Sequence, residues 1–121
     1  MDVMISAYLD IVEGMMKESK EIESSLIAED RKDEANIERV RYNIYEIFVI
    51  MVNATKKATK DKAGFCDSYL KKFDTIPASW KERLELARKH QDVETVLLEE
   101  TKLKVVAELK NLFQNLSSTK E

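Results

Sequence analysis

The sequence contains little of what turns, phosphate-binding loops and reactive sites require: one proline, two glycines, one histidine and one cysteine among 121 residues. Glycine and proline supply most tight turns, while histidine and cysteine supply many metal ligands and activated nucleophiles. Their scarcity argues against a loop-rich fold and leaves few ways to build a catalytic site. The single cysteine, Cys66, excludes an intramolecular disulfide and suits a reducing compartment.

Strong charge of one sign and long apolar runs are also missing. The net charge is −3 and the pI is about 5.4, whereas wholesale nucleic-acid binding normally needs a basic face. No run approaches the ~20 apolar residues of a membrane span. The chain opens Met1-Asp2 without a basic stretch, and Asp10 and Glu13 interrupt the first apolar segment, so no secretory signal is visible. We expect a cytoplasmic protein with neither a nucleic-acid nor a membrane partner.

Apolar and charged residues make up most of the chain, at 44% and 36%. This combination is typical of helices with one apolar stripe and one charged face. We therefore predict an all-α, up-and-down helical bundle of four to five helices with antiparallel neighbours, namely three long helical arms plus one short helix. One domain is expected over residues 1–116, followed by a frayed polar tail at 117–121.

Apolar residues that alternate in steps of three and four predict the first two helices. The first should run from about Val3 to Ala28, and a turn should follow near Asp30. The second should run from about Asp33 to Lys62, with Asp30 or Asp33 as its cap. Ala63-Gly64 is expected to break this helix and to precede the short third one.

The second half of the chain carries clearer helix punctuation. Pro77 disfavours helical geometry at the residue before it and should end the third helix. Ser79 and Glu82 have the spacing of a capping box and predict a helix start. Asp92 is placed to cap a separate final helix that ends at about Leu116. A break over residues 90–92 is favoured, but one continuous helix over 80–116 remains an alternative.

The segment Ile44–Val52 is apolar around the whole circumference of a helix, and only Glu46 in it is charged. Such a helix must be buried on more than one side, either inside the bundle or against another subunit. Glu46 and Asn53 lie two turns apart on one edge, an arrangement that fixes register in helical interfaces. The edge predicted as an interface comprises Tyr42, Tyr45, Glu46, Val49, Ile50 and Asn53. Contact of this edge with the short third helix is the alternative.

Arg83 and His90 are separated by six residues, which resembles the Arg-x4–6-His spacing of HEPN ribonucleases and nucleotide-binding domains. These are small, all-α and usually dimeric proteins. The resemblance covers only these two residues and implies that His90 would act as acid or base and Arg83 would hold a phosphate. The acidic segment after His90 suits RNA poorly. This enzymatic function is kept as the alternative.

The remaining polar clusters are interpreted as solvated helix faces. Glu18 and Glu21 have the spacing used in all-α, Mg²⁺-dependent nucleoside triphosphate pyrophosphatases, but the Glu-x-x-Asp partner motif of that family is absent here. The lysines between Lys56 and Lys72 include no arginine, the residue preferred for planar phosphate recognition. We expect no metal and no cofactor. The sequence favours a non-enzymatic module that self-associates or docks a partner helix through the second helix.

Overall fold

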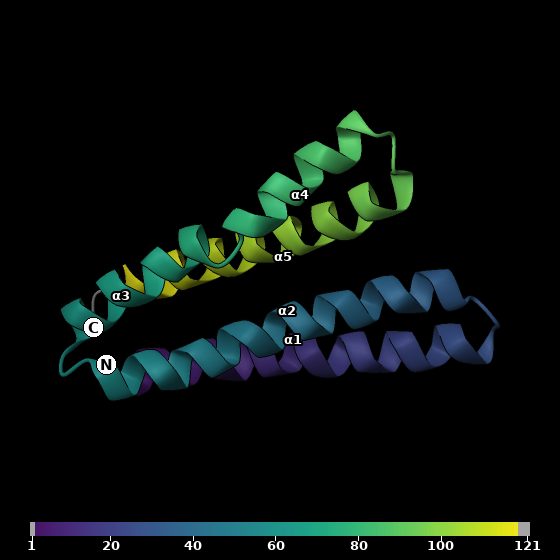
Figure 1. Ribbon diagram of the computed structural model, residues 1–121. Coiled ribbons are helices and arrows are strands. Elements are labelled where there is room, and N and C mark those ends of the chain that lie inside the picture. Colours follow the sequence, from purple (N-terminus) through teal and green to yellow (C-terminus); the bar gives the residue numbers. More distant parts are fainter. Residues whose placement is uncertain (1, 119–121) are drawn as a thin grey trace.

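The computed structural model describes residues 2–118, which form helices and short turns without a strand in that range (Figure 1). The predicted all-α bundle is confirmed. The helices are α1 (Asp2–Ala28), α2 (Lys32–Ala58), α3 (Lys62–Thr75), α4 (Ala78–Lys89) and α5 (Val93–Ser117). α3 and α4 follow one another along α5, so the five helices build four arms in up-and-down order.

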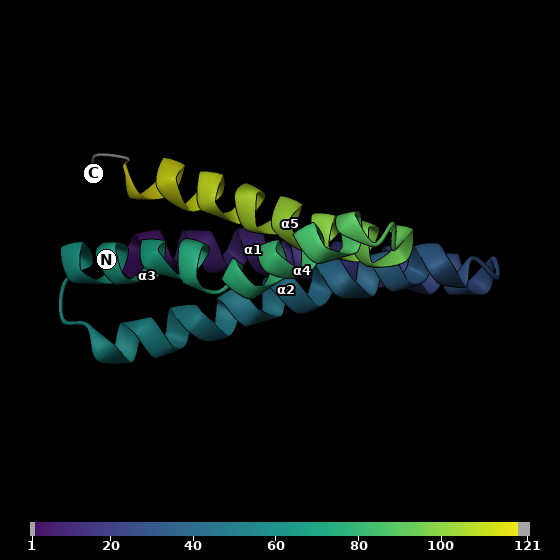
Figure 2. The same ribbon diagram turned by 45° about the horizontal axis from the view of Figure 1, so that its top comes forward.

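Consecutive arms run antiparallel, but α2 and α5 run in the same direction and contact each other (Figure 1). At the end of the molecule where α1 begins and α5 ends, α2 and α5 lie on opposite sides of α1 and α3 (Figure 2). α2 contacts α1, α3 and α5. The sequence pattern predicted antiparallel neighbours only, because a stripe of apolar residues carries no information on the direction of the helix that covers it.

The two turns at the far end of the hairpins are Schellman motifs without glycine. Asp30 follows α1 with φ 60°, and the Arg31 N–H donates to the Leu26 carbonyl at 2.8 Å. Gln91 adopts φ 56° between α4 and α5. The turn predicted near Asp30 is therefore confirmed. The predicted cap by Asp30 or Asp33 is wrong, because α2 begins after Arg31 without a side-chain cap.

Asp61 determines where α3 begins. α2 ends at Ala58 and not at Lys62, so the break lies ahead of the predicted Ala63-Gly64. The Gly64 N–H donates to Asp61 Oδ1 at 2.8 Å, which satisfies one amide of the first turn. A Cβ on residue 64 would lie 3.0 Å from that oxygen. Gly64 thus makes room for the capping carboxylate instead of breaking the helix.

Pro77 starts α4, and the predicted capping box of Ser79 and Glu82 is wrong. Both residues lie inside the helix, and the N-cap position is Pro77, whose carbonyl accepts from the Trp80 and Lys81 amides. Proline suits a helix start because its φ is fixed and it has no N–H to leave unpaired. α3 ends at Thr75, ahead of Pro77 as predicted, although Ile76 itself keeps a right-handed helical conformation.

The break between α4 and α5 is confirmed, and Asp92 caps α5 as predicted. Asp92 Oδ2 accepts from Thr95 Oγ1 at 2.7 Å, and Oδ1 accepts from the Thr95 amide at 3.2 Å. These hydrogen bonds lower the pKa of the Asp92 carboxyl. α5 continues through Ser117, one residue into the predicted tail, and residues 119–121 lie outside the described range.

The hydrophobic core occupies only the half of the bundle that contains the start of α1 and the end of α5. Aromatic rings from α1, α2, α3 and α5 meet there edge to face or stacked. The Tyr8 and Tyr69 hydroxyls are 2.9 Å apart, and Tyr69 donates to the Phe48 carbonyl at 3.1 Å. The fully covered core side chains include Tyr8, Val12, Tyr45, Phe48, Val52, Phe65, Tyr69, Val105, Leu109 and Phe113.

Candidate functional site

The apolar segment Ile44–Val52 is explained largely by the central position of α2. Ile44, Phe48 and Val52 are buried in the core between α1, α3 and α5. Ile47, Val49 and Met51 are half-buried and pack against the same core. Ile50 is the one large hydrophobic side chain of this segment that is strongly exposed, at 53%. The segment therefore leaves little apolar surface for a second chain.

The predicted interface edge is divided between core and surface. Tyr45 is buried, so it cannot contact another chain in this conformation. Its hydroxyl donates to Glu108 Oε1 at 2.8 Å and accepts from Arg41 Nη2 at 3.2 Å; burial and the Glu108 bond raise the pKa of Tyr45 to about 12. Tyr42 and Val49 are half-buried. Glu46, Ile50 and Asn53 are exposed and form a narrow strip along α2.

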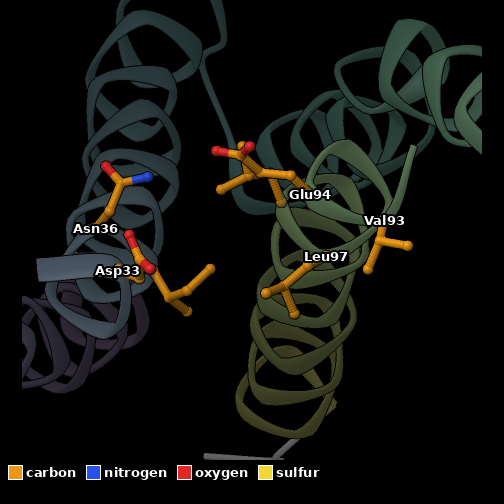
Figure 3. A pocket seen from close by; sticks show the side chains of 7 residues that line it. Asp33, Asn36, Val93, Glu94 and Leu97 are labelled. Atoms are coloured by element: carbon orange, nitrogen blue, oxygen red, sulfur yellow. The ribbon is translucent and has the colours of Figure 1, made fainter. Parts of the chain in front are cut away.

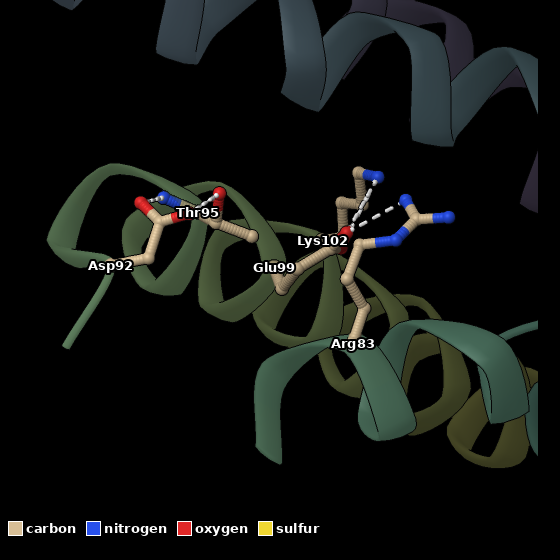
Figure 4. Close-up of polar contacts among 5 residues, drawn as sticks. All are labelled: Arg83, Asp92, Thr95, Glu99 and Lys102. Carbon is tan, nitrogen blue, oxygen red and sulfur yellow. Dashed lines mark hydrogen bonds and ion pairs between the residues drawn. The ribbon is translucent and has the colours of Figure 1, made fainter. Parts of the chain in front are cut away.

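Arg83 lies within α4 and His90 follows its last residue, and the two side chains have different surroundings. Arg83 Nη1 lies 3.0 Å from Glu99 Oε1 of α5 (Figure 4). His90 is exposed at the C-cap of α4, and its amide donates to the Leu86 carbonyl. Arg83 therefore directs its charge at a carboxylate of this chain. Nothing in these contacts favours a nuclease, and that function stays a prediction from sequence.

The two hairpins α1–α2 and α4–α5 diverge toward their turns (Figure 1). We call the diverging parts the distal arms: residues 17–43 form one and residues 81–104 form the other. The residues buried in the distal arms are mostly small or polar, unlike those of the aromatic core. They are Ser19, Glu23 and Ala35 in the first arm, and Leu84, Ala87, Glu99 and Thr101 in the second.

A buried glutamate joins the two helices of each distal arm. Glu23 of α1 accepts from Arg39 of α2 at 2.8 Å, and Glu99 of α5 accepts from Arg83 of α4 at 3.0 Å. Lys102 Nζ also donates to Glu99 Oε1 at 3.3 Å and lies 3.1 Å from Glu99 Oε2 (Figure 4). Both glutamates are nearly covered, while their arginine partners are more than half exposed. Each arm thus has a buried ion pair between its two helices and few fully buried apolar side chains.

An open cleft separates the two distal arms, with a volume of about 410 Å³. One wall is the start of α2 and the other is the start of α5; Figure 3 shows Leu97 and Glu94 directed toward the side where Asp33 and Asn36 lie. The lining residues are Asp33, Asn36, Ile37, Val93, Glu94, Leu97 and Leu98. Leu97 is 52% exposed and Val93 is 78% exposed.

The rim of the cleft is acidic. Asp33 of α2 and Glu94 of α5 both line it, and none of the lining residues is basic. Within residues 2–118, no cation lies within ion-pair distance of either carboxylate. The nearest cations in sequence are already engaged: Arg31 pairs with Glu29 and Glu34, and Lys32 pairs with Asp30. The cleft therefore has apolar walls and an acidic rim whose two carboxylates have no ion-pair partner among the described residues.

Sequence reasoning did not find this cleft, although part of its signal was present. Val93 and Leu97 widen the apolar stripe of the last helix beyond the width that one seam requires. Ile37 looked like an ordinary seam residue of the second helix. The divergence of the arms leaves these side chains exposed, and it depends on how the helices meet in space, which the pattern within one segment does not carry. The burial of Glu23 and Glu99 is hidden in the same way, because from sequence they cannot be distinguished from surface charges.

No known protein family matches this chain, and comparisons with curated proteins and with solved structures find no significant match. Two further observations concern the part of the chain that the structure describes. None of its helices combines the length and apolarity needed to cross a bilayer. It also contains no cluster of three His, Cys, Asp or Glu side chains arranged to hold a metal ion; Glu18 and Glu21 are both exposed on α1.

Proposed function

We propose that this chain is a non-enzymatic, cytoplasmic interaction module that docks a helix in the cleft between its distal arms. One observation carries the proposal: Leu97 and Val93 of α5 are exposed beside Ile37 of α2, in a cleft whose walls are two helices. Burying a leucine side chain completely stabilises a complex by roughly 1.5–3 kcal/mol. A third helix laid between α2 and α5 would cover these residues.

The shape of the site supports a helix as its occupant. Val93 and Leu97 are four residues apart, so they lie on one face of α5, and both line the cleft. A helix docks in such a groove through residues spaced by three and four positions. The predicted edge of α2 has less exposed apolar surface for a partner, because Ile50 is its one strongly exposed hydrophobic residue. The cleft is therefore the better-supported docking surface.

The test uses a fluorescently labelled 18-residue helix with leucine at heptad positions a and d and neutral glutamine or alanine elsewhere. Replacing Leu97 by Asp should weaken binding about tenfold or more, which corresponds to ~1.4 kcal/mol. Ile50→Asp is the matched control, because the two side chains are equally exposed at 52% and 53% and gain the same charge. Anisotropy titration measures Kd, and circular dichroism verifies that both variants stay helical. Equal affinities of wild type and Leu97→Asp would contradict the proposal.

A second copy of the chain could supply the docking helix. Light scattering on a sizing column over a wide concentration range tests this possibility. A dimer that Leu97→Asp dissociates would place the second copy in the cleft. A dimer that only Ile50→Asp dissociates would instead identify the exposed strip Glu46, Ile50 and Asn53 as the subunit interface, as predicted from sequence.

A further inference from the structure

We infer that the helix that docks in the cleft is cationic: an amphipathic helix of another protein whose leucine-like stripe is flanked by lysine or arginine. This inference rests on the proposed function and specifies its partner. The two rim carboxylates belong to opposite walls, Asp33 to α2 and Glu94 to α5. A helix between the walls would therefore meet one negative charge along each of its flanks.

Neither rim carboxylate is used by the fold in a hydrogen bond or an ion pair among the described residues. α2 begins after Arg31 without a side-chain cap, so Asp33 does not cap it. Asp92, and not Glu94, caps α5. Both acids do lie in a first helical turn, where a negative charge is favoured by the helix dipole. This dipole contribution stabilises the helix itself and predicts no preference among partners. A binding experiment that compares partners therefore separates it from partner recognition.

Charge also argues against a second copy as the occupant. The chain has a net charge of −3. The α1–α2 turn and the first residues of α2 together carry Glu29, Asp30, Asp33 and Glu34 against Arg31 and Lys32. Two such ends brought together would place like charges opposite each other, which is unfavourable at an interface. A basic partner would instead pair with the free carboxylates, and the attraction would decrease as salt screens it.

The experiment compares three labelled peptides with the same leucine stripe and with lysine, glutamine or glutamate at the flanking positions. Two exposed charge pairs of ordinary strength correspond to a preference of about five- to tenfold for the lysine peptide over the glutamine peptide. The double variant Asp33→Asn/Glu94→Gln should abolish this preference and leave binding of the glutamine peptide unchanged. Raising the salt concentration should have the same effect on the wild type.

Glu82→Gln/Glu85→Gln is the matched control, because it removes two exposed α4 acids that have no ion-pair partner in the described range. It changes the net charge equally and should keep the preference. Equal binding of the lysine and glutamine peptides, or an equal loss in the control, overturns the cationic partner and leaves the docking proposal standing. Failure of all three peptides to bind overturns the docking proposal as well. Lysine-peptide binding that Leu97→Asp does not weaken is charge attraction outside the cleft and overturns the inference.

Discussion

Gln91 adopts a backbone conformation that disfavours its own side chain. A positive φ places the Cβ of an L-residue close to the backbone and costs roughly 1–2 kcal/mol, which only glycine avoids. Asp30 occupies the corresponding place in the other distal turn, and aspartate tolerates it because its short side chain can bond locally. Gln91 lacks this advantage. The absence of glycine at this position therefore lowers the stability of the folded chain.

Replacing Gln91 by Gly should raise the free energy of unfolding by about 0.5–1 kcal/mol, because the strain disappears while the unfolded chain gains some freedom. Urea unfolding followed by circular dichroism measures the change. Lys89→Gly is the control at the last residue of α4. There glycine should lower the free energy of unfolding by about 0.5–1 kcal/mol. A Gln91→Gly variant that is less stable than the wild type would show that the glutamine side chain stabilises the turn.

Single residues also explain which helix ends could be predicted. The turn at Asp30 and the cap at Asp92 follow from polar residues with no competitor nearby. Ser79 and Glu82 had the right spacing, but Pro77 stands two residues earlier and starts α4 first. The sequence suggests that Gly64 breaks a helix. Its actual role depends on the close approach of the Asp61 carboxylate to residue 64, which spacing along the chain does not show. A local motif therefore predicts a helix end correctly where no second motif competes with it.

At the scale of the helices, α4 and α5 are joined by two ion pairs of equal length and different burial. Arg83 to Glu99 and Arg88 to Glu100 both measure 3.0 Å, but Glu99 is 2% exposed and Glu100 is 38% exposed. Removing the partner of a buried charge leaves that charge uncompensated, whereas an exposed charge regains water. The sequence shows four similar charged residues and cannot separate the pairs.

Arg83→Met should therefore destabilise the protein by about 1–2 kcal/mol, a value kept low because water already screens the exposed guanidinium and Lys102 remains near Glu99. Arg88→Met should change stability by less than ~0.5 kcal/mol. Thermal unfolding of both variants makes the comparison. The double variant Arg83→Met/Glu99→Met should recover part of the loss, since both partners become apolar. Equal effects of the two single variants would mean that the burial of Glu99 has no energetic consequence.

At the scale of the whole molecule, the two halves of the bundle differ in their buried residues: one half has the aromatic core, and the other has mostly small or polar buried side chains. Apolar periodicity predicted the helices and the burial of Ile44–Val52, because these depend on the pattern within one segment. It could not predict that the aromatic residues gather in one half of the bundle, since that depends on which segments meet. The candidate cleft lies in the other half: the distal arms contain ion pairs, and the aromatic core does not extend between them.

The same asymmetry predicts the pattern of amide hydrogen exchange. Core amides such as those of Tyr8, Val12, Leu109 and Phe113 should exchange slowest, because their exposure requires global unfolding. Amides of α4 and of the first turns of α5 should exchange at least tenfold faster, because an arm held by Arg83–Glu99 can open without disturbing the core. Exchange followed by NMR measures each residue, and Arg83→Met should speed exchange in the second distal arm alone. Uniform protection along α5 would show that the two halves open as one unit, and the cleft would then be a rigid groove instead of a space between separately mobile arms.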